Sequence, residues 1–199
     1  MKVKCDLEGI TQAANAVNDG KVIIFPTDTV YGIGCDPFNK KAVEEIFRIK
    51  QRDATKSLPV LGYSKNELES IVELNELHEK IITQFWPGPL TIIGKIKNEK
   101  LKDSLNLNEK IAVRVPNNEC VLEILKKCKL LVGTSANISG QKSFVEPKEY
   151  FEQFKDIPVF VDGGKIISSG ESTIIELVEN EVKVIREGKI TKEEIQKIL

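Results

Sequence analysis

Short apolar runs that are typical of buried strands outnumber the helical segments in this sequence, and several of these runs follow one another directly along the chain. A wholly parallel, doubly wound sheet alternates strands with helices, so this order argues against it. The sequence instead predicts an α/β fold with a twisted mixed sheet flanked by helices. The predicted strands are residues 22–25, 58–61, 90–96, 111–115, 130–132, 159–161, 172–177 and 182–185.

The predicted helices carry apolar residues at helical spacing between these strands. Gly20 supplies a stop for the first helix, and capping-box patterns begin others at Ser64 and Thr191. The predicted helices are residues 7–19, 40–49, a short one after Ser64, 75–85, 120–127, 147–154 and a final one after Thr191. No internal repeat, linker or compositional break interrupts this series, so we expect residues 1–199 to form a single domain.

The balance of charge excludes some classes of protein. Basic residues number 29 against 30 acidic ones, with a formal net charge of -1, which argues against a globally basic nucleic-acid binder. The amino terminus has Asp6 and Glu8 where a secretory signal needs apolar residues, and no segment approaches the ~20 apolar residues of a membrane helix. We therefore expect a cytoplasmic protein with no membrane partner.

The four cysteines, Cys5, Cys35, Cys120 and Cys128, form no C-x-x-C pair, and the single histidine cannot complete a Cys/His zinc set. We expect free thiols and no metal site in the protein. The histidine, His78, lies beside an apolar helical stripe, so we expect it at a boundary or on the surface.

Five segments at the ends of the predicted strands concentrate glycine, proline, hydroxyl and basic residues, as ligand loops on α/β scaffolds do. The first, residues 25–34, carries the hydroxyls of Thr27, Thr29 and Tyr31; it is either a ligand loop or a strand-turn-strand corner. The second, residues 50–57, carries three cations that would form a phosphate clamp or simply compensate the helix dipole at a solvated turn. These cations are Lys50, Arg52 and Lys56.

The remaining three segments are as ambiguous when taken singly. Arg114 interrupts an apolar strand and would face either a site or solvent. The loop of residues 133–140, followed by Ser143, presents hydroxyls, an amide and backbone N–H groups to an anion, but it lacks the pattern of a phosphate loop or a nucleophile elbow. Ser172 and Arg186 lie at opposite ends of a predicted hairpin, which would bring a hydroxyl and a guanidinium together.

In order along the chain, these segments closely resemble the YrdC family of threonylcarbamoyl-adenylate synthases across about residues 10 to 190. The resemblance implies a YrdC-like α/β fold with a concave, positively lined cavity. It also implies a nucleotidyltransferase that joins L-threonine, bicarbonate and ATP into threonylcarbamoyl-AMP and pyrophosphate. The motifs are Pro26-Thr-Asp-Thr-Val-Tyr-Gly-Ile-Gly34, Lys50-x-Arg52-x-x-x-Lys56-x-Leu-Pro59, Trp86-Pro-Gly-Pro-Leu-Thr91, Val113-Arg-Val-Pro116, Thr134-Ser-Ala-Asn-Ile-Ser-Gly140, Ser172-Thr173 and Arg186-x-Gly188.

The resemblance also assigns roles to residues. It places Thr29, Arg114 and Ser172 near threonine or its carbamate, with Tyr31 as a nearby wall. It makes Lys50, Arg52 and Lys56 the catalytic, phosphate-facing cluster, of which Arg52 and Lys56 also bind ATP. The other expected ATP contacts are Gly133, Thr134, Ser135, Asn137, Ser143 and Arg186. Mg²⁺ is expected to arrive with ATP rather than in a protein cage.

Two departures and two alternatives accompany the resemblance. Asp28 stands where many relatives have glutamate, and residues 60–62 lack a histidine that some relatives carry there, so that threonine contact does not transfer. In the family, partner proteins use the adenylate to modify tRNA at position 37. A phosphate-lined groove also suits RNA, so a paralogue that binds nucleotide or double-stranded RNA without synthase activity stays open, as does weak RNA binding by the synthase itself. A carbamoyl-adenylate-forming enzyme related to hydrogenase maturation proteins is a further alternative.

Overall fold

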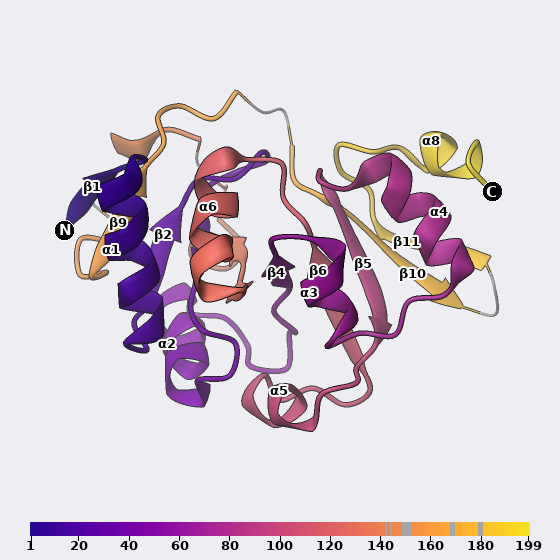
Figure 1. Ribbon diagram of the computed structural model, residues 1–199, viewed down its shortest axis with the longest axis horizontal. Helices are drawn as coiled ribbons and strands as arrows, with labels where there is room; N and C mark the ends of the chain where they lie inside the picture. Colours follow the sequence, from indigo (N-terminus) through magenta and orange to yellow (C-terminus); the bar gives the residue numbers. More distant parts are fainter. Residues whose placement is uncertain (142, 144, 149–152, 168–169, 179–180) are drawn as a thin grey trace.

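The computed structural model contains two mixed sheets joined edge to edge, with helices on both sides (Figure 1). It describes residues 1–199 except 142, 144, 149–152, 168–169 and 179–180. The predicted mixed α/β architecture is confirmed, although the strands divide between two sheets rather than one. Part of the predicted helix 147–154 falls outside the described residues.

The five-stranded sheet has the order β1-β9-β2-β3-β8. Strand β9 pairs in parallel with β1 and β2, whereas β3 pairs antiparallel with β2 and β8. The strands are β1 (Lys2–Lys4), β2 (Ile23–Phe25), β3 (Gly32–Gly34), β8 (Thr134–Ser135) and β9 (Val159–Asp162). Strands β1, β3 and β8 were not predicted, because they are short and consist of lysines, glycines or hydroxyl residues with weak strand propensity.

The six-stranded sheet has the order β11-β10-β5-β6-β4-β7. Strands β10 and β11 form the predicted antiparallel hairpin, in which Ile174 is paired with Arg186. Strand β10 runs parallel to β5, and β4 runs parallel to β6. The strands are β4 (Val60–Gly62), β5 (Leu90–Lys95), β6 (Lys110–Arg114), β7 (Leu130–Val132), β10 (Thr173–Val178) and β11 (Glu181–Arg186).

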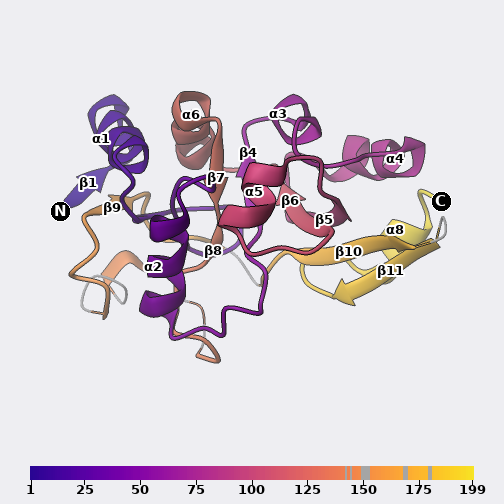
Figure 2. The same ribbon diagram turned by 90° about the horizontal axis from the view of Figure 1, so that it is seen from below.

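The helices cover the two sheets from opposite sides (Figure 2). Helices α1, α6, α3 and α4 follow one another along one face, and α2 lies on the other. The helices are α1 (Leu7–Asn18), α2 (Lys40–Lys50), α3 (Lys65–Glu69), α4 (Glu76–Phe85), α5 (Glu99–Ser104), α6 (Glu119–Cys128) and α8 (Lys192–Gln196). Only α5, a short polar segment capped by Asn98, was missed among them. None of the helices in the described part of the chain is long and apolar enough to cross a membrane.

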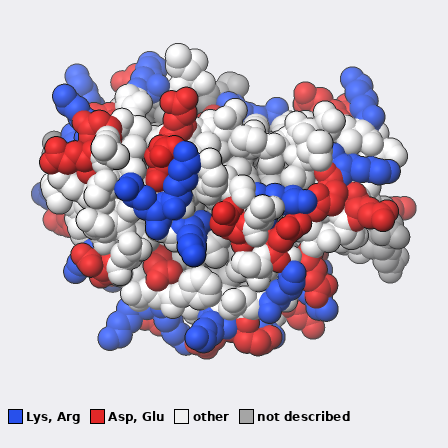
Figure 3. Space-filling view, viewed as in Figure 1, with Lys and Arg blue, Asp and Glu red and all other residues white. Residues whose placement is uncertain are grey.

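His78 is buried at the start of α4, contrary to the boundary or surface position expected for it. Its Nδ1 accepts a hydrogen bond from the backbone N–H of Asn75 at 3.1 Å, so the imidazole caps the helix. Burial lowers the pKa of this histidine. On the outer surface, acidic and basic side chains are interspersed over the face shown in Figure 3, in keeping with the balanced composition.

The two sheets meet where the chain passes from β7 to β8 through Gly133. A Cβ atom at Gly34 would lie 1.8 Å from the carbonyl oxygen of Val132, and one at Gly133 would lie 2.4 Å from Leu61 Cδ1. The backbone N–H of Val132 donates to the carbonyl of Cys35 at 2.9 Å. Gly34 is therefore required because the two backbones approach too closely for a side chain, whereas a side chain at Gly133 would displace that of Leu61 on the neighbouring strand β4.

The expectation that every cysteine is a free thiol was wrong for one pair. Cys5 and Cys120 form a disulfide with a Cα–Cα distance of 5.8 Å, whereas Cys35 and Cys128 are free. The bond joins the start of α1 to the start of α6, and these two helices pack against each other. A search for local cysteine spacing cannot detect this pair, because 115 residues separate the two cysteines.

Replacing Cys5 and Cys120 together by serine is expected to lower the free energy of unfolding by about 2–5 kcal/mol, since the bond closes a long loop in the unfolded chain. Denaturant unfolding without reductant measures the difference. Treatment of the wild type with dithiothreitol serves as a control and should reproduce the loss. Equal stability of the two proteins, with four alkylatable thiols in the denatured wild type, would show that the bond does not form.

Candidate functional site

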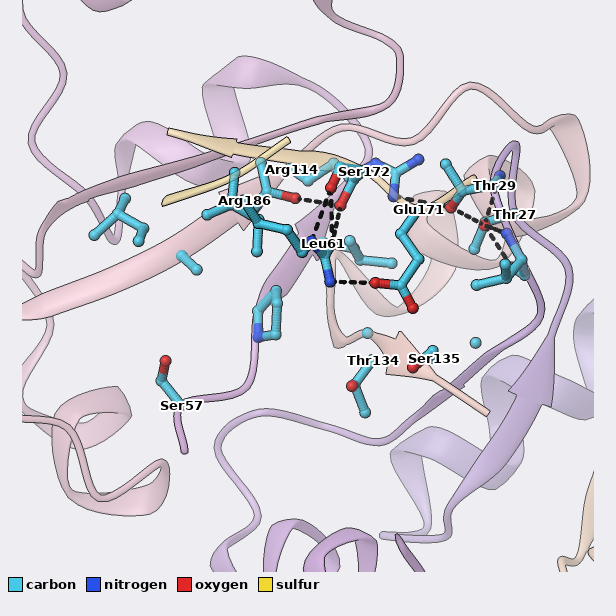
Figure 4. Close-up of a pocket in the computed structure, with 18 of the residues that line it drawn as sticks. Thr27, Thr29, Ser57, Leu61, Arg114, Thr134, Ser135, Glu171, Ser172 and Arg186 are labelled. Carbon is cyan, nitrogen blue, oxygen red and sulfur yellow. Dashed lines mark hydrogen bonds and ion pairs between the residues drawn. The ribbon is translucent and has the colours of Figure 1, made fainter. Parts of the chain in front are cut away.

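A cavity of about 260 Å³ lies at the junction of the two sheets (Figure 4). Strand ends and loops from both sheets line it, which brings together residues distant in the sequence. Most of the predicted site residues are on its walls: Thr29, Arg52, Arg114, Gly133, Thr134, Ser135, Ser172 and Arg186. The volume is near the lower end of the range for small-molecule sites.

Arg114 at the end of β6 is buried in the cavity wall rather than turned to solvent. Its Nη2 donates to Asp28 Oδ1 at 2.6 Å, and its Nη1 donates to Thr29 Oγ1 at 3.2 Å. Its Nε donates to the carbonyl of Gly88 at 2.9 Å. Burial lowers the pKa of Arg114, and the charge of Asp28 opposes that shift. The guanidinium therefore links the two sheets and holds the Thr29 loop in place.

The Thr29 loop, residues 26–31, is rigidified by its own hydroxyls. Thr27 Oγ1 donates to the carbonyl of Val30 at 2.6 Å and accepts from the backbone N–H groups of Thr29 and Val30. The loop joins the paired strands β2 and β3. The segment is thus a strand-turn-strand corner that also lines the cavity; that it binds a ligand stays a prediction.

The β10–β11 hairpin brings Ser172 and Arg186 together, as predicted. Arg186 Nη2 donates to Ser172 Oγ at 3.1 Å and to the Ser172 carbonyl at 2.8 Å. Ser172 Oγ also lies 3.1 Å from Thr91 Oγ1 on the adjacent strand β5. Arg186 forms an ion pair with Glu171 on the same wall. Figure 4 shows the Glu171 carboxylate directed toward Arg186.

Arg52 follows α2 and enters the cavity with few partners of its own. Its Nη2 donates to the carbonyl of Ser57 at 3.1 Å, but its buried Nε has no hydrogen-bond partner among the described residues. Burial and the nearby charge of Arg186 both lower the pKa of Arg52. Two guanidinium groups therefore share one side of the cavity, where an anion would relieve their repulsion.

Lys50 is not on a solvated turn but is fully buried at the end of α2. Its Nζ donates to the carbonyls of Ser135 and Asn137, the latter at 2.8 Å. Burial, followed by the charge of Arg52, lowers the pKa of this amine to about 8, while Glu171 opposes the shift. Lys50 thus holds the loop after β8 against α2; the expectation that it faces phosphate stays a prediction.

Four other predicted residues are outside the cavity wall. Tyr31 is buried behind the wall; its hydroxyl donates to the carbonyl of Gly164 at 2.7 Å, and its ring stacks on Phe160. Asn137 Nδ2 donates to the carbonyl of Gln141 at 2.6 Å. Ser143 Oγ donates to Glu171 Oε1 at 3.0 Å, whereas Lys56 is exposed on the loop before β4.

Sequence reasoning overlooked three residues of the site. Asp28 was noticed only as a departure from the family pattern, although a carboxylate is needed beside a buried arginine. Glu171 precedes Ser172, and from the sequence only the Ser172 hydroxyl was given a role. Thr91 ends a family motif and lies in the predicted strand 90–96, but it was given no role in a site. Within residues 60–62, where the family resemblance leads to the expectation of a histidine in some relatives, Leu61 lines the cavity.

Comparison with known proteins gives concordant matches. The profile of the Sua5/YciO/YrdC family, described as "Telomere recombination", matches residues 15–188. A putative threonylcarbamoyl-AMP synthase of Methanocaldococcus jannaschii is 38% identical over 86% of this chain and 82% of its own length. The threonylcarbamoyl-AMP synthase of Pyrococcus abyssi is 34% identical over 94% of this chain, which spans only 56% of that protein. The crystal structure of P. abyssi Sua5 complexed with L-threonine superposes with a TM-score of 0.90 at 32% identity, covering 100% of this chain and 60% of that one.

Replacing Asp28 by asparagine is expected to lower the free energy of unfolding by about 3–5 kcal/mol, because it leaves a buried guanidinium without its carboxylate. The side chains of the pair are only 7% and 13% exposed. Asp103→Asn is the matched control, since Asp103 pairs with Lys40 at the surface and should cost less than about 1 kcal/mol. Urea denaturation measures both; similar losses would contradict the structural role of the buried pair.

The burial of Lys50 predicts a pH dependence of stability. With a folded-state pKa of about 8 against the ordinary lysine value of 10.5, the unfolded chain binds more protons between these values. The penalty for burying the ammonium is thus complete below pH 8 and is relieved as the pH rises toward 10.5. As the pH rises between these two pKa values, the free energy of unfolding of the wild type should increase relative to that of Lys50→Met by up to about 1.4 kcal/mol per pH unit.

Unfolding curves between about pH 7 and the ordinary lysine pKa of 10.5 test this, with Lys41→Met, an exposed lysine on the same helix, as the control variant. Lys50→Met should also be less stable at neutral pH, because the carbonyls of Ser135 and Asn137 lose their donor. A constant difference between wild type and Lys50→Met over the whole range would contradict the shifted titration.

Proposed function

Because this chain belongs to the Sua5/YciO/YrdC family, we propose that it catalyses the reaction for which its relatives are named, the synthesis of threonylcarbamoyl-AMP. L-threonine, bicarbonate and MgATP are the proposed substrates. The observation that carries the proposal is that one cavity combines the hydroxyls of Thr29 and Ser172 with the guanidinium groups of Arg52, Arg114 and Arg186. Such a lining suits a substrate that joins a small polar amino acid to phosphates.

The hydroxyl groups of this lining are the proposed site of threonine and its carbamate. Thr29, Ser172 and Arg114 offer hydroxyl and guanidinium groups within a buried wall. Such groups suit the carboxylate and hydroxyl of threonine. The L-threonine complex of P. abyssi Sua5, a protein of the same fold, supports threonine as a ligand. Arg114 is fixed by Asp28, so it provides an oriented positive charge without reorganisation.

The chemistry requires no covalent intermediate with the protein. Threonine nitrogen and bicarbonate form a carbamate with release of water. A carbamate oxygen then attacks the α-phosphorus of ATP, the bond to the β-phosphate oxygen breaks, and pyrophosphate leaves with Mg²⁺. The chain's own contribution is to hold the two reactants in line and to stabilise charge on the leaving group with Arg52 and Arg186. Positioning and electrostatics are sufficient for this step, which fits a cavity without a nucleophile dyad.

The direct test is incubation with MgATP, L-threonine and labelled bicarbonate, quenched early and analysed by mass spectrometry with pyrophosphate measured in parallel. Threonine-dependent pyrophosphate and a labelled adenylate are the expected products. In the cell the adenylate would supply partner proteins that modify tRNA position 37. A folded chain that makes no adenylate but binds double-stranded RNA would favour the binding paralogue instead.

Arg52→Ala is expected to reduce kcat/KM by about 100-fold or more while leaving the fold intact, because a charged donor is lost beside the leaving group. Lys56→Ala tests the second predicted cation in the same assay. Arg48→Ala is the matched control, since Arg48 is exposed and pairs with Glu45 on α2. Circular dichroism confirms folding, and an unimpaired Arg52→Ala variant would contradict the phosphate clamp.

A further inference from the structure

Glu171 is the one acidic side chain among the described residues that line the cavity. Its Oε2 pairs with Arg186 Nη1, and its Oε1 accepts a hydrogen bond from Ser143 Oγ at 3.0 Å. Both of these partners are residues that the sequence assigns to ATP. A carboxylate thus occupies donors that suit phosphate oxygens equally well.

The backbone of Glu171 is fixed, whereas its carboxylate has these two contacts among the described residues. The Glu171 carbonyl accepts from the N–H of Lys189 at 3.0 Å, and a Cβ atom at Gly188 would lie 2.3 Å from the same carbonyl oxygen. The paired side chains are 39% exposed for Glu171 and 42% for Arg186. An ion pair this exposed is weak, so a stronger anion is able to replace the carboxylate without moving the strands.

We propose that Glu171 is an internal substitute for phosphate: its carboxylate holds Arg186 and Ser143 in the free protein and is displaced when the polyphosphate of a nucleotide binds. This inference rests on the proposed function, because it takes ATP as the displacing anion. The charges around the carboxylate are consistent with such an exchange. Burial and then the charge of Arg186 lower the pKa of Arg52, whereas Glu171 opposes the lowering of the Lys50 pKa.

The exchange has a consequence that differs between phosphate-bearing ligands and threonine. An anion that must displace the carboxylate binds only to molecules in which the carboxylate is already detached. Its apparent Kd is therefore its intrinsic Kd divided by the detached fraction. Threonine, proposed to bind beside Arg114 and Thr29, does not compete with Glu171 and is unaffected. The carboxylate therefore weakens the binding of every anion that displaces it by the same factor and leaves threonine binding unchanged.

The test is calorimetric titration of the full chain with inorganic pyrophosphate and, separately, with ATP in the absence of threonine and bicarbonate. E171Q removes the ion pair and keeps the size of the side chain. Its Kd for pyrophosphate is expected to be up to about fivefold lower than that of the wild type, which corresponds to a detached fraction of about one fifth. The Kd for L-threonine should be unchanged.

Two further variants separate direct competition from a general change of charge. E187Q removes the same charge from the residue next to Arg186 and should leave the Kd for pyrophosphate nearly unchanged. E171D keeps the charge but shortens the side chain, so it should also bind pyrophosphate more tightly.

Equal or weaker pyrophosphate binding by E171Q overturns the proposal, as does an equal gain in E187Q. Failure of wild type and E171Q alike to bind pyrophosphate and ATP overturns it together with the phosphate site. If the wild type makes the adenylate but E171Q binds pyrophosphate no more tightly than the wild type, the displacement of Glu171 is overturned and the proposed synthase activity is not. The two proposals therefore fail separately.

Discussion

The close approach of the two sheets at Gly34 determines where this protein has a cavity. Because a side chain at Gly34 would collide with the Val132 carbonyl, β3 and β7 come together closely enough for one backbone to bond to the other. On one side of this seam the Thr29 loop closes the corner of the five-stranded sheet. On the other side β4, β5, β6 and β10 end in the residues that face it. The cavity thus forms where the two sheets meet, and neither sheet alone supplies all of its walls.

The ion pair between Arg114 and Asp28 crosses this seam and fixes its geometry. The guanidinium contacts Asp28, Thr29 and the Gly88 carbonyl at once. Asp28 Oδ1 also accepts from the backbone N–H of Asn117 at 3.1 Å. Replacing a buried ion pair of this kind by two apolar side chains of the same size changes the free energy of unfolding little. Removing only one partner is costly, because the other charge is left buried and unpaired. The value of the ion pair lies in orientation, because the arginine cannot leave the wall without leaving a buried carboxylate unpaired.

Much of the fold and part of the site follow from the sequence, and the limits have physical causes. Consecutive apolar runs predicted the β10–β11 hairpin, and with it the meeting of Ser172 and Arg186, because their pairing is local. Strand alternation could not tell whether Arg114 faces solvent, since that depends on which sheet covers β6. The burial of Lys50 and the bond between Cys5 and Cys120 depend on contacts between distant segments. No spacing rule encodes these contacts, so they require the structure.

The cationic side chains in and around the cavity differ in how well neighbouring carboxylates and carbonyls balance their charge. This difference separates the cations that hold the structure together from those that are available to bind a ligand. Arg114 has a buried carboxylate partner, and Lys50 is surrounded by carbonyls, so both remain in place when a ligand enters. Arg186 is balanced by an exposed carboxylate, and the Nε of Arg52 has no partner in the described part of the chain. Anion binding gains most where compensation is weakest. Under the proposed function, Arg114 and Lys50 are framework groups, whereas Arg52 and Arg186 are the groups proposed to bind phosphate, within a chain whose overall charge is near zero.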